Sequence, residues 1–272
     1  MSWHALRVRP SRDRELVIAA LFASGSQGVL EDGDSLVTHF PSDADVDEIR
    51  AGIARADSGA TVEVTESPTV DWSEAWKHGV GAHDLGTLAV VPPWLEGKRD
   101  PARTIVIDPG MAFGTGEHQS TRCVMRLMQQ IIRLGDHVAD LGAGSGVLSI
   151  AAAKLGAASV AAIEMDPEAI GNAQENVDRN GVADRVSVIE GEAGLLLQLV
   201  APVRVVLANI LSSVIVELLP AIAAALAPDG EVILSGILVA ERSDMLAVLQ
   251  SDWRVVAEEA EEKWWSVAVA RA

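Results

Sequence analysis

A glycine-rich run, Asp140-Leu141-Gly142-Ala143-Gly144-Ser145-Gly146, ends an apolar stretch and precedes a segment with helical spacing. Glycines at a strand-to-helix turn let the backbone bend sharply, and a ligand can lie against them because no Cβ blocks its approach. The dinucleotide fingerprint needs its third glycine one position later, where this chain has Val147. The run therefore predicts a nucleotide-type ligand at Gly142 and Gly144, and it weakens the case for NAD.

An acidic residue ends the next predicted strand. Glu164 lies 22 residues after Gly142. At that distance a carboxylate, which only accepts hydrogen bonds, can take both hydroxyls of a ribose. Asp166 is an alternative acceptor, but Pro167 directly after it predicts that Asp166 caps the next helix.

The segment 108–121 is rich in glycine and in polar donors. Thr121 would lie in the first turn of the following helix, where hydroxyls and free backbone N–H groups can reach a ligand carboxylate. Phe113, Thr115 and His118 are candidates for the wall of a substrate channel. For His118 three roles stay open, namely general base, cofactor-facing donor and helix cap.

Asn209 follows an apolar strand at the edge where open parallel sheets bind ligands. Its amide can donate to and accept from an amine or a cofactor. We assign no catalytic base from the sequence. We also expect no metal, because no pair of histidines has the spacing of metal ligands.

From about residue 103, strands and helices must alternate to position these side chains. Apolar strands separated by helical segments predict a mostly parallel sheet covered on both faces. Only residues 258–263 separate the last two strands, so one edge is a hairpin. Strands are expected at 105–107, 138–141, 160–163, 186–190, 203–208, 231–235, 254–257 and 265–270, and helices near 119–133, 147–155, 167–180, 212–226 and 240–250.

The first 66 residues have the order β-α-β-β-α-β, a ferredoxin-like α+β pattern. Asp32-Gly33-Asp34 is a hairpin signal, and Ser11 is the expected N-cap of the first helix. We predict three parts: residues 1–66, a linker over 67–100, and an α/β domain over 101–272. Trp72 and Trp76 share a helical face in the linker, where they either pack between domains or stack on a substrate.

The 272 residues include 39 acidic and 21 basic side chains, a formal charge of −18. This excess argues against a nucleic-acid binder and against anionic membranes, and it permits a basic protein partner. The single cysteine, Cys123, excludes an intrachain disulfide framework and favours the cytoplasm. No apolar stretch approaches the roughly 20 residues that span a bilayer, and we expect no signal peptide.

Together, the glycine run, the strand, the acid and the terminal hairpin favour a seven-stranded, Rossmann-like S-adenosylmethionine-dependent methyltransferase over a dehydrogenase. The chain resembles the PrmA family over residues 71–272. The resemblance rests on five motifs: Asp140–Gly146, Glu164-Met165-Asp166-Pro167, Phe113-Gly114-Thr115-Gly116-Glu117-His118, Ala208-Asn209-Ile210-Leu211 and Leu234-Ser235-Gly236-Ile237-Leu238. For residues 1–66 it extends only to the fold.

The resemblance implies an enzyme that methylates the eleventh protein of the large ribosomal subunit, a basic substrate recognised by the N-terminal domain. It implies cofactor contacts at Thr121, Gly142, Glu164 and Asn209. The family commonly has Thr-His-Pro-Thr-Thr where this chain has 117–121, and Asp where it has Glu164. We expect a monomer, and an acidic run over 31–48 to steer the substrate.

Two alternatives stay open at this point. One is a related protein-lysine or small-amine methyltransferase that acts on another target. The other is a protein of a different class, either a non-catalytic cofactor-binding module or a dehydrogenase. The sequence does not choose which amino groups are modified, and it assigns no role to Cys123.

Overall fold

The computed structural model describes residues 3–26, 28–41, 43–67, 81–97, 99–108, 114 and 116–272. The chain divides into two compact units, residues 1–79 and 80–272. Trp72 and Trp76 lie outside the described residues.

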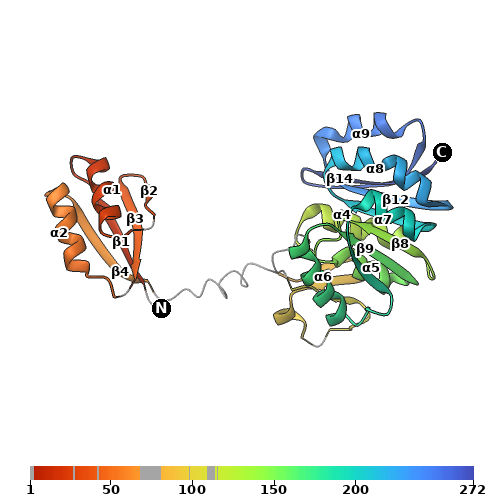
Figure 1. The fold of residues 1–272 in the computed structure, drawn as a ribbon, viewed down its shortest axis with the longest axis horizontal. Coiled ribbons are helices and arrows are strands. Elements are labelled where there is room, and N and C mark those ends of the chain that lie inside the picture. The colour runs from red at the N-terminus through yellow and green to blue at the C-terminus, as the bar shows by residue number, and fades with distance from the viewer. Residues whose placement is uncertain are drawn as a thin grey trace. The chain divides into compact units, whose positions relative to one another are not determined.

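The first unit is a four-stranded antiparallel sheet with two helices (Figure 1). Its strand order, β2-β3-β1-β4, confirms the predicted ferredoxin-like pattern. Both helices contribute to a core with the sheet, through residues such as Val17 of α1 and Ile49 of α2. The elements are β1 (Trp3–Arg9), α1 (Arg14–Ala23), β2 (Leu30–Asp32), β3 (Ser35–Pro41), α2 (Val46–Ala56) and β4 (Thr61–Ser67).

The N-cap of α1 differs from the prediction. Asp13, not Ser11, caps the helix, and its side chain accepts from the backbone N–H of Leu16. The hydroxyl of Ser11 donates to Asp57 instead, at 2.5 Å. This bond and the backbone bond from Ser11 hold the pKa of the Asp57 carboxyl well below its usual range. A tertiary partner 46 residues away thus replaced the local capping contact.

The second unit is built on a seven-stranded sheet of order β10-β9-β8-β11-β12-β14-β13. The first five strands in this order are parallel, and β14 runs antiparallel to β12 and β13. The strands are β8 (His137–Leu141), β9 (Ser159–Glu164), β10 (Val186–Glu190), β11 (Val203–Asn209), β12 (Leu226–Leu238), β13 (Trp253–Glu261) and β14 (Trp264–Arg271). The chain changes direction across the sheet between β8 and β11, which is where such sheets bind ligands.

Helices cover both faces of this sheet (Figure 1). One core includes Leu127, Ile150 and Val177 from α4, α5 and α6, and the other includes Ile215 of α8 and Met245 of α9. The helices are α4 (Gln119–Ile131), α5 (Val147–Leu155), α6 (Pro167–Arg179), α7 (Ala193–Val200), α8 (Ser212–Ala225) and α9 (Arg242–Leu249). All but α7 are predicted from the sequence. That segment is short and almost uniformly apolar, so it shows no helical period.

A second, three-stranded sheet contains β5 (His83–Leu85), β6 (Leu88–Val91) and β7 (Thr104–Val106). The strand expected at 105–107 therefore pairs with β6 rather than with the large sheet. Two of these strands, β5 and β6, lie within the stretch 67–100 that we expect as a linker. The boundaries of the linker stay a prediction. Among the described helices, none has the length and apolar character needed to cross a membrane.

Candidate functional site

The glycine-rich turn lies between β8 and α5, as predicted. Gly142, Gly144 and Gly146 all have positive φ, at 73°, 54° and 79°, a conformation that other L-residues rarely adopt. Gly146 is the N-cap of α5 and supplies no side chain there. The N-terminal N–H groups of α5 thus lie directly after a turn without side chains at those three positions, an arrangement suited to close approach of a ligand.

The Glu164 carboxylate holds this turn at the end of β9. One oxygen, Oε2, accepts from the backbone N–H of Gly144 at 2.8 Å. The other, Oε1, accepts from Met165 and Asp166 at 2.8 and 2.9 Å. A carboxylate offers about four acceptor positions, so roughly one stays open to a ligand hydroxyl rather than the two that we expected for a ribose. Asp166 caps α6, as predicted, by accepting from Glu168.

A second carboxyl group, Asp140, is fully buried beneath the same turn. Its Oδ2 accepts from the Ser149 hydroxyl at 2.6 Å, and its Oδ1 has no hydrogen-bond partner among the described residues. Burial raises the pKa of this carboxyl to about 6, and the negative charge of Glu164 acts in the same direction. Asp140 is not among the predicted site residues, although it begins the glycine motif.

Asn209 and Thr121 meet although 88 residues separate them. Asn209 ends β11, and its Nδ2 donates to the hydroxyl of Thr121 in the first turn of α4 at 3.4 Å. The amide oxygen of Asn209 is buried and has no hydrogen-bond partner among the described residues. A buried acceptor without a partner is costly unless a ligand satisfies it, so this atom is a candidate contact.

His118 is the N-cap of α4. Its Nδ1 lies 3.3 Å from the backbone N–H of Ser120 and 2.7 Å from the Ser120 hydroxyl. The ring meets Trp264 edge to face at 4.7 Å. Burial, followed by the charges of Lys263 and Arg122, holds the pKa of His118 below its ordinary value. Of the three roles left open by the sequence, the geometry supports the helix cap.

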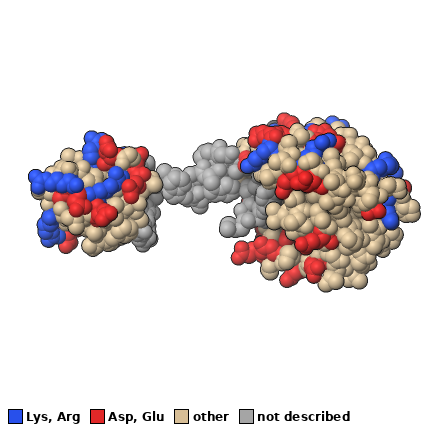
Figure 2. Space-filling view, turned by 90° about the horizontal axis from the view of Figure 1, so that it is seen from above, with Lys and Arg blue, Asp and Glu red and all other residues tan. Residues whose placement is uncertain are grey.

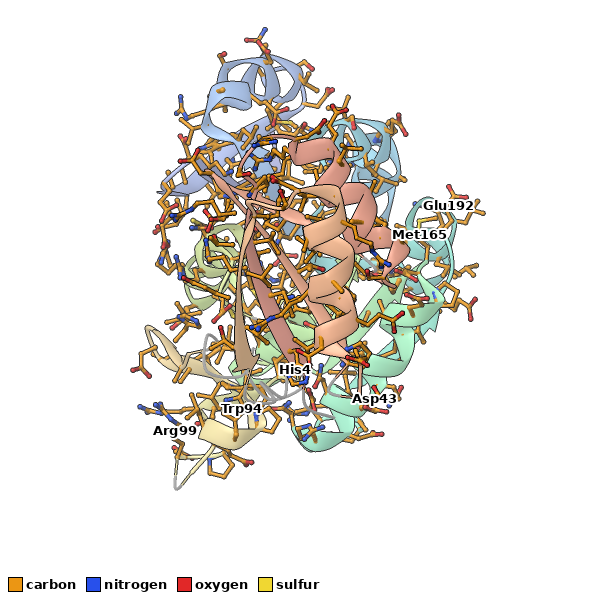
Figure 3. The ribbon with its side chains drawn as sticks, turned by 90° about the vertical axis from the view of Figure 1, so that its left-hand side faces the viewer. His4, Asp43, Trp94, Arg99, Met165 and Glu192 are labelled. Atoms are coloured by element: carbon orange, nitrogen blue, oxygen red, sulfur yellow. The ribbon has the colours of Figure 1, made fainter. Side chains whose placement is uncertain are left out.

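Phe113 and Thr115, the other two candidates for a substrate channel, lie outside the described residues. Met165 and Glu192 are not among the predicted site residues, and both are labelled in Figure 3. Met165 follows Glu164, and Gly191, which precedes Glu192, donates its backbone N–H to the carbonyl oxygen of Glu164. Met165 is 73% exposed. A polarizable thioether suits packing against an aromatic ring. Its position next to Glu164 was the available signal.

The opposite edge of the sheet holds a cavity of about 440 Å³. Its lining includes His137, Ser159 and Ser187, near the amino ends of three strands, and none of the predicted site residues. Among the described residues, no cluster of His, Cys, Asp and Glu could hold a metal ion. The described candidates Thr121, Gly142, Gly144, Glu164 and Asn209 instead come together at the carboxyl edge, around the point where the strand order reverses.

Comparison with known proteins identifies the family of this chain. The family model described as ribosomal protein L11 methyltransferase (PrmA) matches residues 12–272. A ribosomal protein L11 methyltransferase from Symbiobacterium thermophilum is 37% identical, over 88% of this chain and 78% of that protein. One from Heliobacterium modesticaldum is 31% identical, over 100% of this chain and 98% of that protein.

A solved structure is also similar. The ribosomal protein L11 methylase from Lactobacillus delbrueckii subsp. bulgaricus superposes with a TM-score of 0.63 at 32% sequence identity. The superposition covers 70% of this chain and 98% of that one. With a family match over residues 12–272 and relatives above 30% identity along most of their length, this chain belongs to the ribosomal protein L11 methyltransferase (PrmA) family of enzymes.

Proposed function

We propose that this protein transfers methyl groups from S-adenosylmethionine to amino groups of ribosomal protein L11, on lysine side chains, the N-terminal amine or both. The observation that carries the proposal is the pairing of Asn209 with Thr121 at the carboxyl edge of the sheet. The activity named for its relatives supplies the protein substrate.

The residues at this edge fit the parts of S-adenosylmethionine. The turn at Gly142 and Gly144 admits a ligand without a Cβ clash, and Glu164 keeps an acceptor position for a ribose hydroxyl. The first turn of α4, with Thr121, offers donors to a carboxylate. We propose that these residues and Asn209 hold the cofactor. When bound, it supplies a methyl carbon activated by a positively charged sulfur.

The charge of the site also favours this cofactor over NAD. Two carboxyl groups, Asp140 and Glu164, lie close enough for the charge of one to raise the pKa of the other. Such a pair stabilises a ligand with cationic groups and repels the pyrophosphate of a dinucleotide. The dehydrogenase alternative is therefore disfavoured by electrostatics as well as by glycine spacing.

The contribution of the chain to the reaction is mainly orientation. A neutral amine must approach the methyl carbon in line with the bond that breaks, and holding two reactants in this geometry removes much of the entropic barrier. The unpartnered Oδ1 of Asn209 can accept one N–H of that amine and so direct its lone pair. His118 is engaged as a helix cap, and we assign it no proton transfer.

We propose that residues 1–66 recognise the protein substrate. Within the acidic run 31–48, Glu31 and Asp32 pair with Arg14 and Arg7, but Asp43, Asp47 and Glu48 form no ion pair among the described residues. Figure 2 shows acidic and basic side chains interspersed on the visible face of this unit. Unpaired acids can steer a basic protein at low salt. A ribosomal substrate favours the cytoplasm, and we propose that the enzyme acts as a monomer.

Calorimetry tests the cofactor without reference to the substrate. The purified protein should bind S-adenosylhomocysteine, the demethylated product. It should bind NAD at least 100-fold more weakly, a difference of about 2.7 kcal/mol in binding free energy. Binding of NAD alone would favour the dehydrogenase alternative. Binding of neither would remove the proposed function.

Methyl transfer to a protein tests the substrate. Incubation with labelled S-adenosylmethionine and purified L11 should label L11, and the intact mass would count the methyl groups. The same reaction with cell lysate should label a band of the same mass. Labelling of a different protein would support the alternative target, and cofactor binding without any labelling would support a non-catalytic module.

A further inference from the structure

We infer that Ser235 and Gly236, in the motif Leu234–Leu238, are positioning residues that set the geometry of the Asn209–Thr121 pair. The inference rests on the proposed function, since it requires that this pair belong to the reaction site. Ser235 fixes the position of Thr121 on α4, and Gly236 fixes the position of Asn209 on β11.

Ser235 is fully buried in β12. Its hydroxyl donates to the backbone carbonyl of Ser120 at 3.4 Å and lies 2.7 Å from the hydroxyl of Ser266 in β14. Because Ser235 donates to Ser120, Ser266 must donate to Ser235. Ser120 directly precedes Thr121, so this chain of hydroxyl groups ties the first turn of α4 to two strands of the sheet.

Gly236 has a φ of +80°, and the backbone of Ile210 lies against it. A Cβ at position 236 would lie 2.9 Å from the carbonyl carbon of Ile210 and closer still to its oxygen. These are backbone atoms, which cannot move aside by changing a rotamer. Ile210 directly follows Asn209, so only glycine at position 236 allows Asn209 to end β11 where it does.

The other side of Ile210 is also held. A Cβ at Gly142 would lie 2.6 Å from its Cγ2 atom. Ile210 is thus enclosed between the glycine turn after β8 and Gly236 in β12. Asn209 and Ser235 are partners in the parallel register of β11 and β12, so one dipeptide is adjacent to both members of the pair.

This arrangement makes the 3.4 Å separation between Asn209 and Thr121 depend on Ser235 and Gly236 together. A separation at the long end of hydrogen bonding is sensitive to small shifts of either partner. A displacement of about 1 Å in a reaction site can lower the rate by about 100-fold. Ser235 is buried and acts through Ser120, so it affects the site without reaching a ligand.

Gly236→Ala should lower kcat/KM by about 100-fold, because the added Cβ must displace the backbone at Ile210. The matched control is Gly181→Ala. Gly181 also has a positive φ, +64°, but no atom lies within 4 Å of a Cβ built there. The control therefore introduces similar backbone strain without displacing a neighbour, and its kcat/KM should stay near that of the wild type.

Ser235→Ala should lower kcat/KM by about tenfold, because the bond that holds Ser120 next to Thr121 is lost and the resulting displacement is smaller than in Gly236→Ala. The matched control for cofactor binding is Ser26→Ala in the first unit, which removes another buried hydroxyl that is bonded to a second one, Thr38, at 2.6 Å. Affinity for S-adenosylhomocysteine should fall in the first variant and not in the control. Thermal unfolding of all variants identifies any that fail to fold.

A double-mutant cycle separates positioning from simple destabilisation. If Ser235 acts through the pair, Ser235→Ala should have little further effect on turnover in the Asn209→Ala background, while its effect on unfolding persists. Additive losses of turnover would overturn the inference. If Asn209→Ala itself changes neither turnover nor S-adenosylhomocysteine affinity, the proposed site fails. If Asn209→Ala acts and both dipeptide variants do not, only the positioning role fails.

Discussion

The two edges of the seven-stranded sheet differ in how their buried polar and charged side chains are paired. At the amino ends of the strands, the Arg204 guanidinium lies 2.8 Å from Asp136 and 3.9 Å from Glu231. Asp136 also accepts from the backbone N–H of Arg133. At the carboxyl ends, one oxygen of Asp140 and the amide oxygen of Asn209 have no hydrogen-bond partner among the described residues.

The contrast indicates that one edge of the sheet serves stability and the other serves ligand binding. Paired charges at the amino edge connect β11 and β12 with the residue before β8. Nε and Nη1 of Arg204 make no hydrogen bond among the described residues, but they lie 2.8 and 3.9 Å from carboxylate oxygens of opposite charge. Unpartnered acceptors at the carboxyl edge are tolerated in a folded protein where a bound molecule compensates them. We therefore expect substitutions at the carboxyl edge to change ligand binding or turnover, and those at the amino edge to change stability alone.

The largest effect should follow from Asn209→Ala. Removal of its amide should lower kcat by about 100- to 1,000-fold, as loss of a preorganised polar group in a reaction site does. Asn180→Ala is the matched control, because that side chain bonds to both backbone groups of Val106 and should affect only unfolding. Steady-state kinetics with L11 measures the difference. Equal kinetic losses in both variants would contradict the division between the edges.

Arg204→Met should lower the free energy of unfolding by about 3 kcal/mol, because it leaves the buried carboxylate of Asp136 and the half-buried carboxylate of Glu231 without their cation. Urea unfolding, followed by circular dichroism, measures this effect. The kcat of the variant should stay near that of the wild type at temperatures where it is folded. A large loss of kcat without a loss of stability would extend the reaction site to the amino edge.

Asp140→Asn should stabilise the protein at neutral pH by about 3 kcal/mol, since burial raises the pKa of this carboxyl from its ordinary range to about 6. The sign follows from the direction of the shift. Because its raised pKa favours the protonated carboxyl in the folded state, Asp140 contributes to stability below about pH 4. The wild type loses this contribution to stability as the pH rises from about 4 to 6.

The measurement for Asp140→Asn is the free energy of unfolding between pH 4 and 8. The difference from the wild type should grow between pH 4 and about 6 and then level off. Affinity for S-adenosylmethionine should fall in the same variant, because a negative charge near a cationic ligand is lost. Parallel stability curves would show that Asp140 does not titrate in this range.

Those parts of the carboxyl edge that depend on local spacing are predictable from the sequence. The glycine turn and the cap at Asp166 follow from residues close together in the chain, and Glu164 follows from the length of one strand–helix–strand unit. Thr121 and Asn209 are each predicted separately. Their mutual contact is not predictable from either motif, because it depends on how α4 packs over β11.

Where the prediction and the structure differ, tertiary contacts decided the outcome. Ser11 is a reasonable N-cap by its neighbours, but its hydroxyl bonds to Asp57 in the folded unit. The role of Gly236 depends on the close approach of Ile210, which is its neighbour in space and not in sequence. The exposed fraction of Met165 likewise requires the folded chain.

The smallest effect should follow from His137→Ala, and this variant sharpens the comparison most directly. His137 lines the cavity at the amino edge, and its ring bonds to the Ser159 hydroxyl at 2.6 Å in an exposed position. Exposed hydrogen bonds contribute little, so unfolding should change by no more than about 0.5 kcal/mol. Turnover and S-adenosylhomocysteine affinity should not change, because the cavity contains none of the residues assigned to the site. A tenfold loss of either would show that the cavity at the amino edge takes part in function. In this fold, cavity volume would then be a better indicator of the functional site than buried polar atoms without a partner.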